Sequence, residues 1–104
     1  MDPIKLTQGD DLNAFGQEYN FVLSTEADLT GWKAVFELDG YQQVWSDITS
    51  KKLSLEIPAK FSKCIKAGRQ FGALKIYDQN GLCKTVKKDI EFIIEPEVVK
   101  SWQS

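Results

Sequence analysis

Residues 32–40, Trp-Lys-Ala-Val-Phe-Glu-Leu-Asp-Gly, decide the fold class of this chain. Apolar side chains stand at positions 32, 34, 36 and 38, and charged side chains stand at 33, 37 and 39. Alternation with a period of two is the pattern of a β-strand with one buried face. Asp39-Gly40 is a strong signal for a hairpin turn. The segment therefore predicts a strand followed by a hairpin, with Trp32 as a core residue.

Six further short runs show the same kind of pattern, separated by turn residues. They lie near residues 4–7, 19–23, 43–48, 53–57, 71–78 and 82–95. In the run 43–48 the alternation places Val44 and Ile48 on one face and Trp45 on the other. The run 71–78 is apolar on both faces, which predicts a central strand. In the last run, positions 86, 90, 92 and 94 are apolar and share a face.

The period changes between the fifth and sixth runs. Phe61 and Ile65 are four residues apart and Gly68 follows, which predicts one or two helical turns. Seven short strands with turn signals about every 8–12 residues are typical of a sandwich or small barrel. We therefore predict an all-β fold, a seven-stranded immunoglobulin-like β-sandwich over residues 1–95 with a short helical turn between strands five and six. Residues 96–104 form a C-terminal tail and candidate docking segment.

Composition narrows the class of partner. The chain has 104 residues, the size of one domain, and a net charge of −2. This charge gives no electrostatic basis for binding nucleic acid, which requires neutralisation of phosphates. No apolar run approaches the ~20 residues of a membrane helix, and the start Met-Asp-Pro-Ile-Lys lacks the pattern of a cleaved leader. We expect neither a nucleic-acid nor a membrane partner.

The residues of common catalytic and metal sites are scarce. The chain contains no histidine, which removes the usual general base, the Ser-His and Cys-His pairs and most zinc sites. The adjacent pair Asp10-Asp11, together with Asp28 or Asp47, could supply oxygen ligands for calcium, but a solvated turn is favoured because no alternating Asp-x-Asp loop is present. We expect no enzyme activity, no cofactor and no metal.

The two cysteines, Cys64 and Cys83, fall at opposite ends of the sixth strand. Eight residues at about 3.3 Å each separate them by roughly 25 Å, whereas a disulfide requires Cα atoms within about 7 Å. Two free thiols are predicted.

The order of several short motifs resembles a family of small domains from tailed bacteriophages. The motifs are Gly9-Asp10, Asp28-Leu29-Thr30-Gly31-Trp32 leading into Lys33-Ala34-Val35-Phe36, Ala67-Gly68, and Tyr77-Asp78 with Asn80-Gly81. Together they resemble the immunoglobulin-like module at the N-terminus of baseplate upper proteins and in other virion proteins, over most of residues 4–95. The resemblance implies a structural role without chemistry, partners among capsid or tail proteins, and a virion protein made in the bacterial host cytoplasm. Because no fibre or receptor-binding region follows within the 104 residues, a capsid decoration (auxiliary) protein or a small tail accessory protein is expected.

Two groups of residues are candidate protein contacts. The first is Val98, Val99 and Trp102 in the tail, which would share a face in a helix, and tryptophan is a frequent interface anchor. The second is Tyr41 and Trp45 around the hairpin of strands three and four, where exposed aromatics could instead stack on a sugar. A carbohydrate- or host-surface-binding module, with weak carbohydrate contact, is therefore the alternative function. A third hypothesis is an adhesin-type domain that accepts a strand at a sheet edge.

Overall fold

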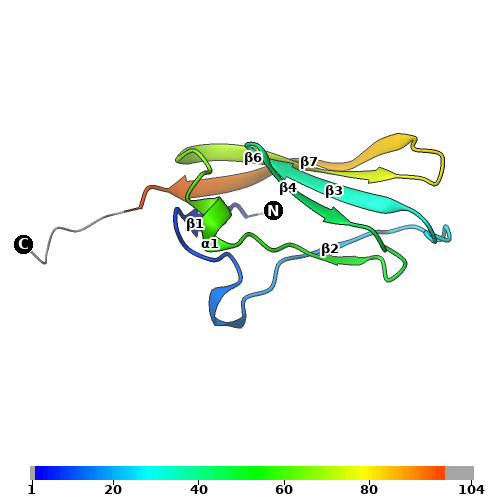
Figure 1. Cartoon of the computed structure of the whole chain (residues 1–104), viewed down its shortest axis with the longest axis horizontal. Coiled ribbons are helices and arrows are strands. Elements are labelled where there is room, and N and C mark those ends of the chain that lie inside the picture. The colour runs from blue at the N-terminus through cyan, green and yellow to red at the C-terminus, as the bar shows by residue number, and fades with distance from the viewer. Residues whose placement is uncertain (1, 98–104) are drawn as a thin grey trace, which may run out of the picture.

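The regular secondary structure of the protein is mostly β-strand, as the computed structural model shows for residues 2–97 (Figure 1). The strands are β1 (Ile4–Thr7), β2 (Asn20–Val22), β3 (Lys33–Leu38), β4 (Tyr41–Trp45), β5 (Lys52–Ser54), β6 (Gly68–Tyr77) and β7 (Cys83–Glu95). Two short helices accompany them, the 3-10 helix η1 (Ala14–Gly16) and α1 (Ala59–Ser62). The all-β class and the helical turn between the fifth and sixth strands are confirmed.

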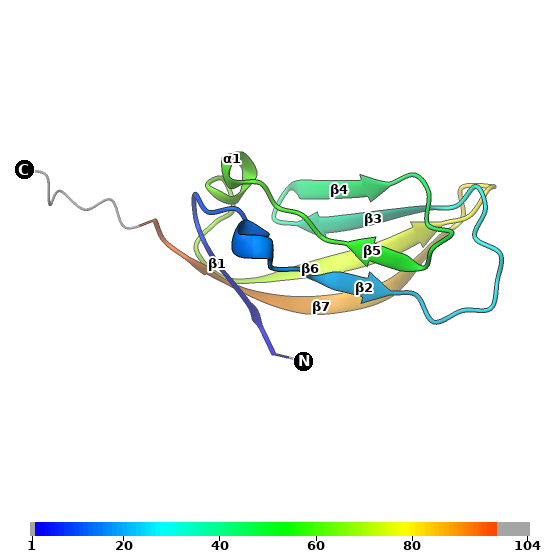
Figure 2. The same ribbon diagram turned by 90° about the horizontal axis from the view of Figure 1, so that it is seen from below.

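The strands form two sheets. One is a mixed sheet in the order β1-β7-β6-β3-β4, in which β1 runs parallel to β7 and every other pair is antiparallel. The other is the antiparallel pair β2-β5, which lies over one face of the larger sheet (Figure 2). β6 has β7 on one side and β3 on the other, so the expectation of a central sixth strand is confirmed.

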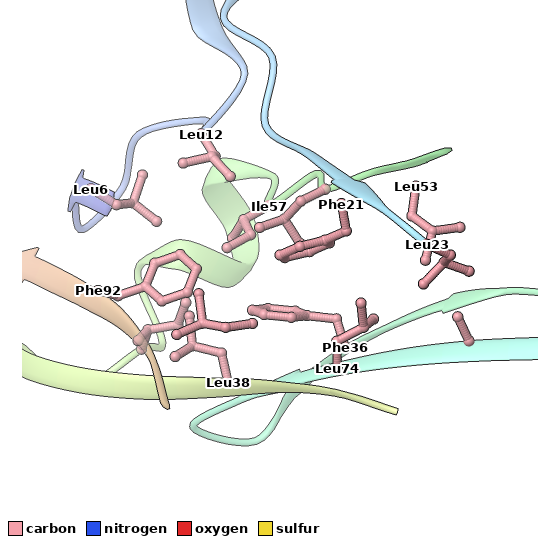
Figure 3. Close-up of a cluster of buried hydrophobic side chains, with 14 of the residues drawn as sticks. Leu6, Leu12, Phe21, Leu23, Phe36, Leu38, Leu53, Ile57, Leu74 and Phe92 are labelled. Atoms are coloured by element: carbon pink, nitrogen blue, oxygen red, sulfur yellow. The ribbon is translucent and has the colours of Figure 1, made fainter. Parts of the chain in front are cut away.

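The core lies between the sheets, where side chains of both point toward one another (Figure 3). Phe36 of β3 has no exposed surface and lies between Phe21 of β2 and Phe92 of β7, with ring centroids 5.9 and 5.8 Å away. The alternation that predicted β3 is confirmed, because Ala34, Phe36 and Leu38 are buried and Trp32 packs against the core.

β4 differs from its prediction. It begins at Tyr41 and ends at Trp45, and Ile48 follows in a turn. Val44 is 57% exposed while Ile48 is fully buried, so these two side chains do not share a face as expected. The reason is local: the Asp47 carboxylate accepts hydrogen bonds from the Thr49 amide and hydroxyl, and this turn directs Ile48 inward. Trp45 packs against the core.

β7 keeps its predicted face across two irregularities. Gly72 pairs with Ile90 and Ile76 pairs with Lys84, so four steps on β6 oppose six on β7. The two extra residues are β-bulges, and Asp89 in this region has a φ of 57°. Val86 lies at the second irregularity, between the pairs Leu74–Lys87 and Lys75–Thr85, and packs against the core, as Ile90 does.

Candidate interaction surfaces

One long side of the two-sheet fold is closed by side chains of β4. Gln43 donates to the Ser54 carbonyl (3.0 Å) and accepts from the Glu56 amide (2.8 Å), joining β4 to β5 and the chain that follows it. The Tyr41 hydroxyl donates to the Glu56 carbonyl. These bonds connect the edges of the two sheets, although no backbone ladder joins them.

Tyr41 and Trp45, the hairpin candidates of the sequence analysis, lie on this closed side. The Tyr41 ring packs on Phe61 of α1 with centroids 5.3 Å apart, and burial raises the pKa of its phenol. Both residues are half-buried and pack against the core. Their contacts are those of residues that hold β4 over the core.

The opposite long side is open. Between β2 and the β6–β7 hairpin lies a groove of about 520 Å³. Its apolar lining comprises Phe21, Leu23, Leu29, Trp32, Leu74, Ile76 and Val86, and its rim comprises Val22, Ser24, Thr25, Lys84, Thr85 and Lys87. β1 pairs only with the stretch Phe92–Glu95 of β7, so the remainder of that strand has no neighbour on this side.

A fully exposed aromatic ring stands on the connection between β1 and β2. Phe15, in η1, is 103% exposed relative to its reference and has a φ of 59°. A left-handed conformation of a bulky residue costs about 1–3 kcal/mol and persists only where the surroundings impose it. A second hollow of about 210 Å³, partly lined by Lys5, Leu12 and Glu95, lies beside this ring.

The loop that carries Phe15 is fixed to the rest of the fold. Leu12 is buried, and its amide donates to the Ile57 carbonyl at 2.9 Å. The Asn13 side chain donates to the Leu55 carbonyl (2.9 Å), and the Asp11 carboxylate accepts from the Ala59 amide (2.6 Å). The exposure of the ring is therefore imposed by a braced loop.

A buried hydroxyl holds α1 against the turn after β1. Ser62 is the buried polar residue of the core region, with no exposed surface. Its Oγ accepts from the Gly9 amide (3.0 Å) and donates to the Asp10 carbonyl (2.7 Å). Gln8 adds a bond from its side-chain amide to the Ile65 carbonyl at 2.7 Å.

Asp28 and Asp47, two of the aspartates considered as calcium ligands, stabilise turns by local hydrogen bonds. Asp28 and Asp47 each accept from the amide and hydroxyl of the threonine two residues later. The pKa of Asp28 is lowered chiefly by the Thr30 hydroxyl, and that of Asp47 chiefly by the Thr49 amide. Within residues 2–97, no three carboxylate or thiol side chains gather as a metal site would require.

Both cysteines are free thiols and exposed, as predicted. Cys83 is the strand partner of Tyr77 at the start of β7, and the neighbouring sulfur raises the pKa of the Tyr77 phenol. Cys64 lies after α1, at the other end of β6.

The tail candidates Val98, Val99 and Trp102 lie outside the described residues. In the part of the chain that is described, no helix has the length and apolarity needed to cross a bilayer.

Comparison with known proteins adds no assignment: no model of a protein family matches the chain, and no curated protein resembles it in sequence.

Sequence reasoning missed Phe15 and the groove. Phe15 stands in Asn-Ala-Phe-Gly-Gln, outside any alternating run, and an apolar residue beside glycine in a polar connection was the available signal. The groove has no local signal, because it arises where strands distant in sequence, β2 and β7, face each other without an intervening strand.

Proposed function

We propose that this chain is a non-enzymatic structural protein of a bacteriophage virion. Its small immunoglobulin-like module docks on other virion proteins, as a capsid decoration (auxiliary) protein or a tail accessory protein.

The strand order supports the immunoglobulin-like assignment. In variable-type immunoglobulin domains one sheet contains the strands G, F, C and C′ side by side, and B and E pair in the other. Taking β1 as strand A, the series β7-β6-β3-β4 corresponds to G-F-C-C′ and the pair β2-β5 corresponds to B-E. Trp32, directly before β3, then lies near the position of the strand-C tryptophan.

Phe15 is the observation that carries a docking role. Transfer of a phenylalanine ring from water to an apolar contact is worth about 1.5–3 kcal/mol, and rigid aromatic anchors dominate many protein interfaces. Here the ring is fully exposed, and its backbone holds a costly left-handed conformation on a braced loop. Such strain points to a selected function for the exposed ring.

The virion as the site of action rests on the motif order described above. Its longest motif, Asp28 to Trp32, forms the turn before β3, in which Asp28 binds Thr30 and Leu29 enters the core. A glycan-binding role has no comparable support, because the two aromatic residues suggested for it pack against the core of the protein itself.

The test compares two exposed apolar residues in phage particles. The phage that encodes the chain is made with Phe15→Ser, and with Val44→Ser as a matched control, since Val44 is 57% exposed on β4. Both variants should fold, because neither side chain lies in the core. We expect Phe15→Ser to be reduced at least about tenfold in purified particles, and Val44→Ser to be incorporated normally. Equal incorporation of Phe15→Ser and wild type would refute a docking role for this ring.

A further inference from the structure

The two long sides of the fold are closed to different degrees. On the side of β4, Tyr41 and Gln43 connect the sheets. On the side of β2, a five-stranded sheet is covered by a pair of strands of three residues each, and the groove opens between them. Ile76 and Val86 of the larger sheet are only partly buried there.

β2 presents an unpaired backbone edge to this groove. The Tyr19 carbonyl accepts a hydrogen bond from the Leu55 amide, and the Leu23 amide donates to the Lys51 carbonyl. The backbone groups of the odd-numbered residues in and beside β2 therefore point toward β5. Residues alternate in direction along an antiparallel strand. The backbone N–H and C=O groups of Asn20 and Val22 therefore point to the free edge, and the Val22 side chain is 66% exposed.

We propose that this edge of β2 accepts an extended segment of another protein, whose apolar side chains alternate with carboxylates. The segment adds a third strand to the β2-β5 sheet. One set of its side chains fills the groove over Trp32, Ile76 and Val86. Its carboxylates lie on the opposite face of the added strand, and the positive charge of Lys84 and Lys87 on the rim attracts them. This inference is independent of the proposed virion role.

Charge decides the chemistry of the occupant. The residues that line the groove include Lys84 and Lys87 and no acidic residue. Among the described residues, neither lysine forms an ion pair, the Arg69–Glu91 bridge being elsewhere on the hairpin. An acidic strand would be attracted to this rim, and a basic one repelled.

β2 offers the better edge of the two that border the groove. The neighbouring edge of β7 carries exposed lysines and two bulges, features by which proteins prevent pairing at an edge. β2 is short, but its residues Asn20 to Val22 include no lysine and no bulge. We therefore assign the backbone hydrogen bonds with the segment to β2. The lysines of β7 recognise its carboxylates.

The tail of the chain does not fit the groove. In an extended tail of a second copy, Lys100 shares a face with Val98 and Trp102, which places a third lysine beside Lys84 and Lys87.

The probe is a blocked nonapeptide, Ser-Val-Glu-Val-Glu-Val-Glu-Val-Ser, titrated into the ¹⁵N-labelled full chain. We expect saturable amide shifts centred on Asn20, Val22 and Ser24 and on Lys84 to Lys87. A peptide with lysine in place of each glutamate should bind about tenfold more weakly. In the chain carrying Lys84→Glu and Lys87→Glu, the preference between the two peptides should reverse.

A matched pair at position 22 tests strand pairing itself. Val22→Pro removes the N–H that points to the free edge, and proline is tolerated at such edge positions. Val22→Thr keeps the N–H and a β-branched side chain. We expect Val22→Thr to bind as wild type and Val22→Pro to bind about tenfold more weakly, with amide dispersion showing that both fold.

Four results would overturn the proposal. They are the absence of saturable shifts with the glutamate peptide, equal binding of the two peptides, unchanged binding by a folded Val22→Pro chain, and tighter binding of a peptide copying residues 95–104.

Discussion

Gly72 makes room for the central ring of the core, and adding one methyl group there should destabilise the protein. A Cβ atom at Gly72 would lie 2.8 and 2.9 Å from the Cε1 and Cζ atoms of Phe36, and 3.1 Å from the Glu37 carbonyl oxygen. The ring cannot withdraw, because it is fully buried between Phe21 and Phe92. The backbone at Gly72 does not have a positive φ, so the strain of Gly72→Ala comes from the contact.

Overpacking of this kind costs typically 1–3 kcal/mol. We expect Gly72→Ala to lower the free energy of unfolding by about 2 kcal/mol, or the melting temperature by roughly 8–16 °C for a domain of this size. Urea unfolding followed by tryptophan fluorescence measures the change, with an unchanged slope showing that two-state behaviour is kept.

A double-mutant cycle shows whether Phe36 is the cause. Phe36→Leu alone should also destabilise the protein, by removing ring contacts. Combined with Gly72→Ala, it leaves space for the new methyl group. The loss in free energy of unfolding of the double variant should therefore be smaller, by about 1 kcal/mol or more, than the sum of the losses of the two single variants. Changes that add within about 0.5 kcal/mol would refute the assignment of the clash to Phe36.

Three further experiments test the polar side chains and the thiols of the fold. Ser62→Ala should cost about 1–3 kcal/mol, because it leaves the partly buried Gly9 amide and Asp10 carbonyl without this partner. Ser54→Ala, at an exposed hydroxyl, should cost less than about 0.5 kcal/mol; equal costs would contradict the bracing role of Ser62. The carboxyl pKa values of Asp28 and Asp47 are lowered in the fold, so their stabilising contribution is present above about pH 4 and is lost as the pH falls through the lowered values. Replacing both with asparagine should flatten stability against pH in that acid range, and an unchanged acid profile would count against the two turns. Both thiols should react with Ellman's reagent in the native protein without denaturant; protection of either would contradict its exposure.

The order of strands could be predicted because most of them carry one buried face and are bounded by Gly, Asp or Pro. β3 followed from its alternation and Asp39-Gly40. β7 was placed correctly because Ile90, Phe92 and Ile94 alternate in its regular part, and Val86, at the second bulge, also packs against the core. The helical turn followed from the spacing of Phe61 and Ile65.

The remaining features depend on contacts between distant segments. The direction of Ile48 is set by the turn at Asp47, which interrupts the alternation that had grouped it with Val44. The half-burial of Tyr41 depends on α1, whose Phe61 covers its ring. The position of Phe15 depends on bonds from its loop to residues more than forty positions away. None of these contacts has a local pattern.

The central claim, that the chain is a structural component of a phage particle, is tested most directly by its copy number. Quantitative mass spectrometry of purified particles of the encoding phage measures the chain relative to the major capsid protein. We predict a fixed ratio that is unchanged by further purification and by high-salt washing. A chain found in the infected cell but missing from the purified particles would contradict the claim.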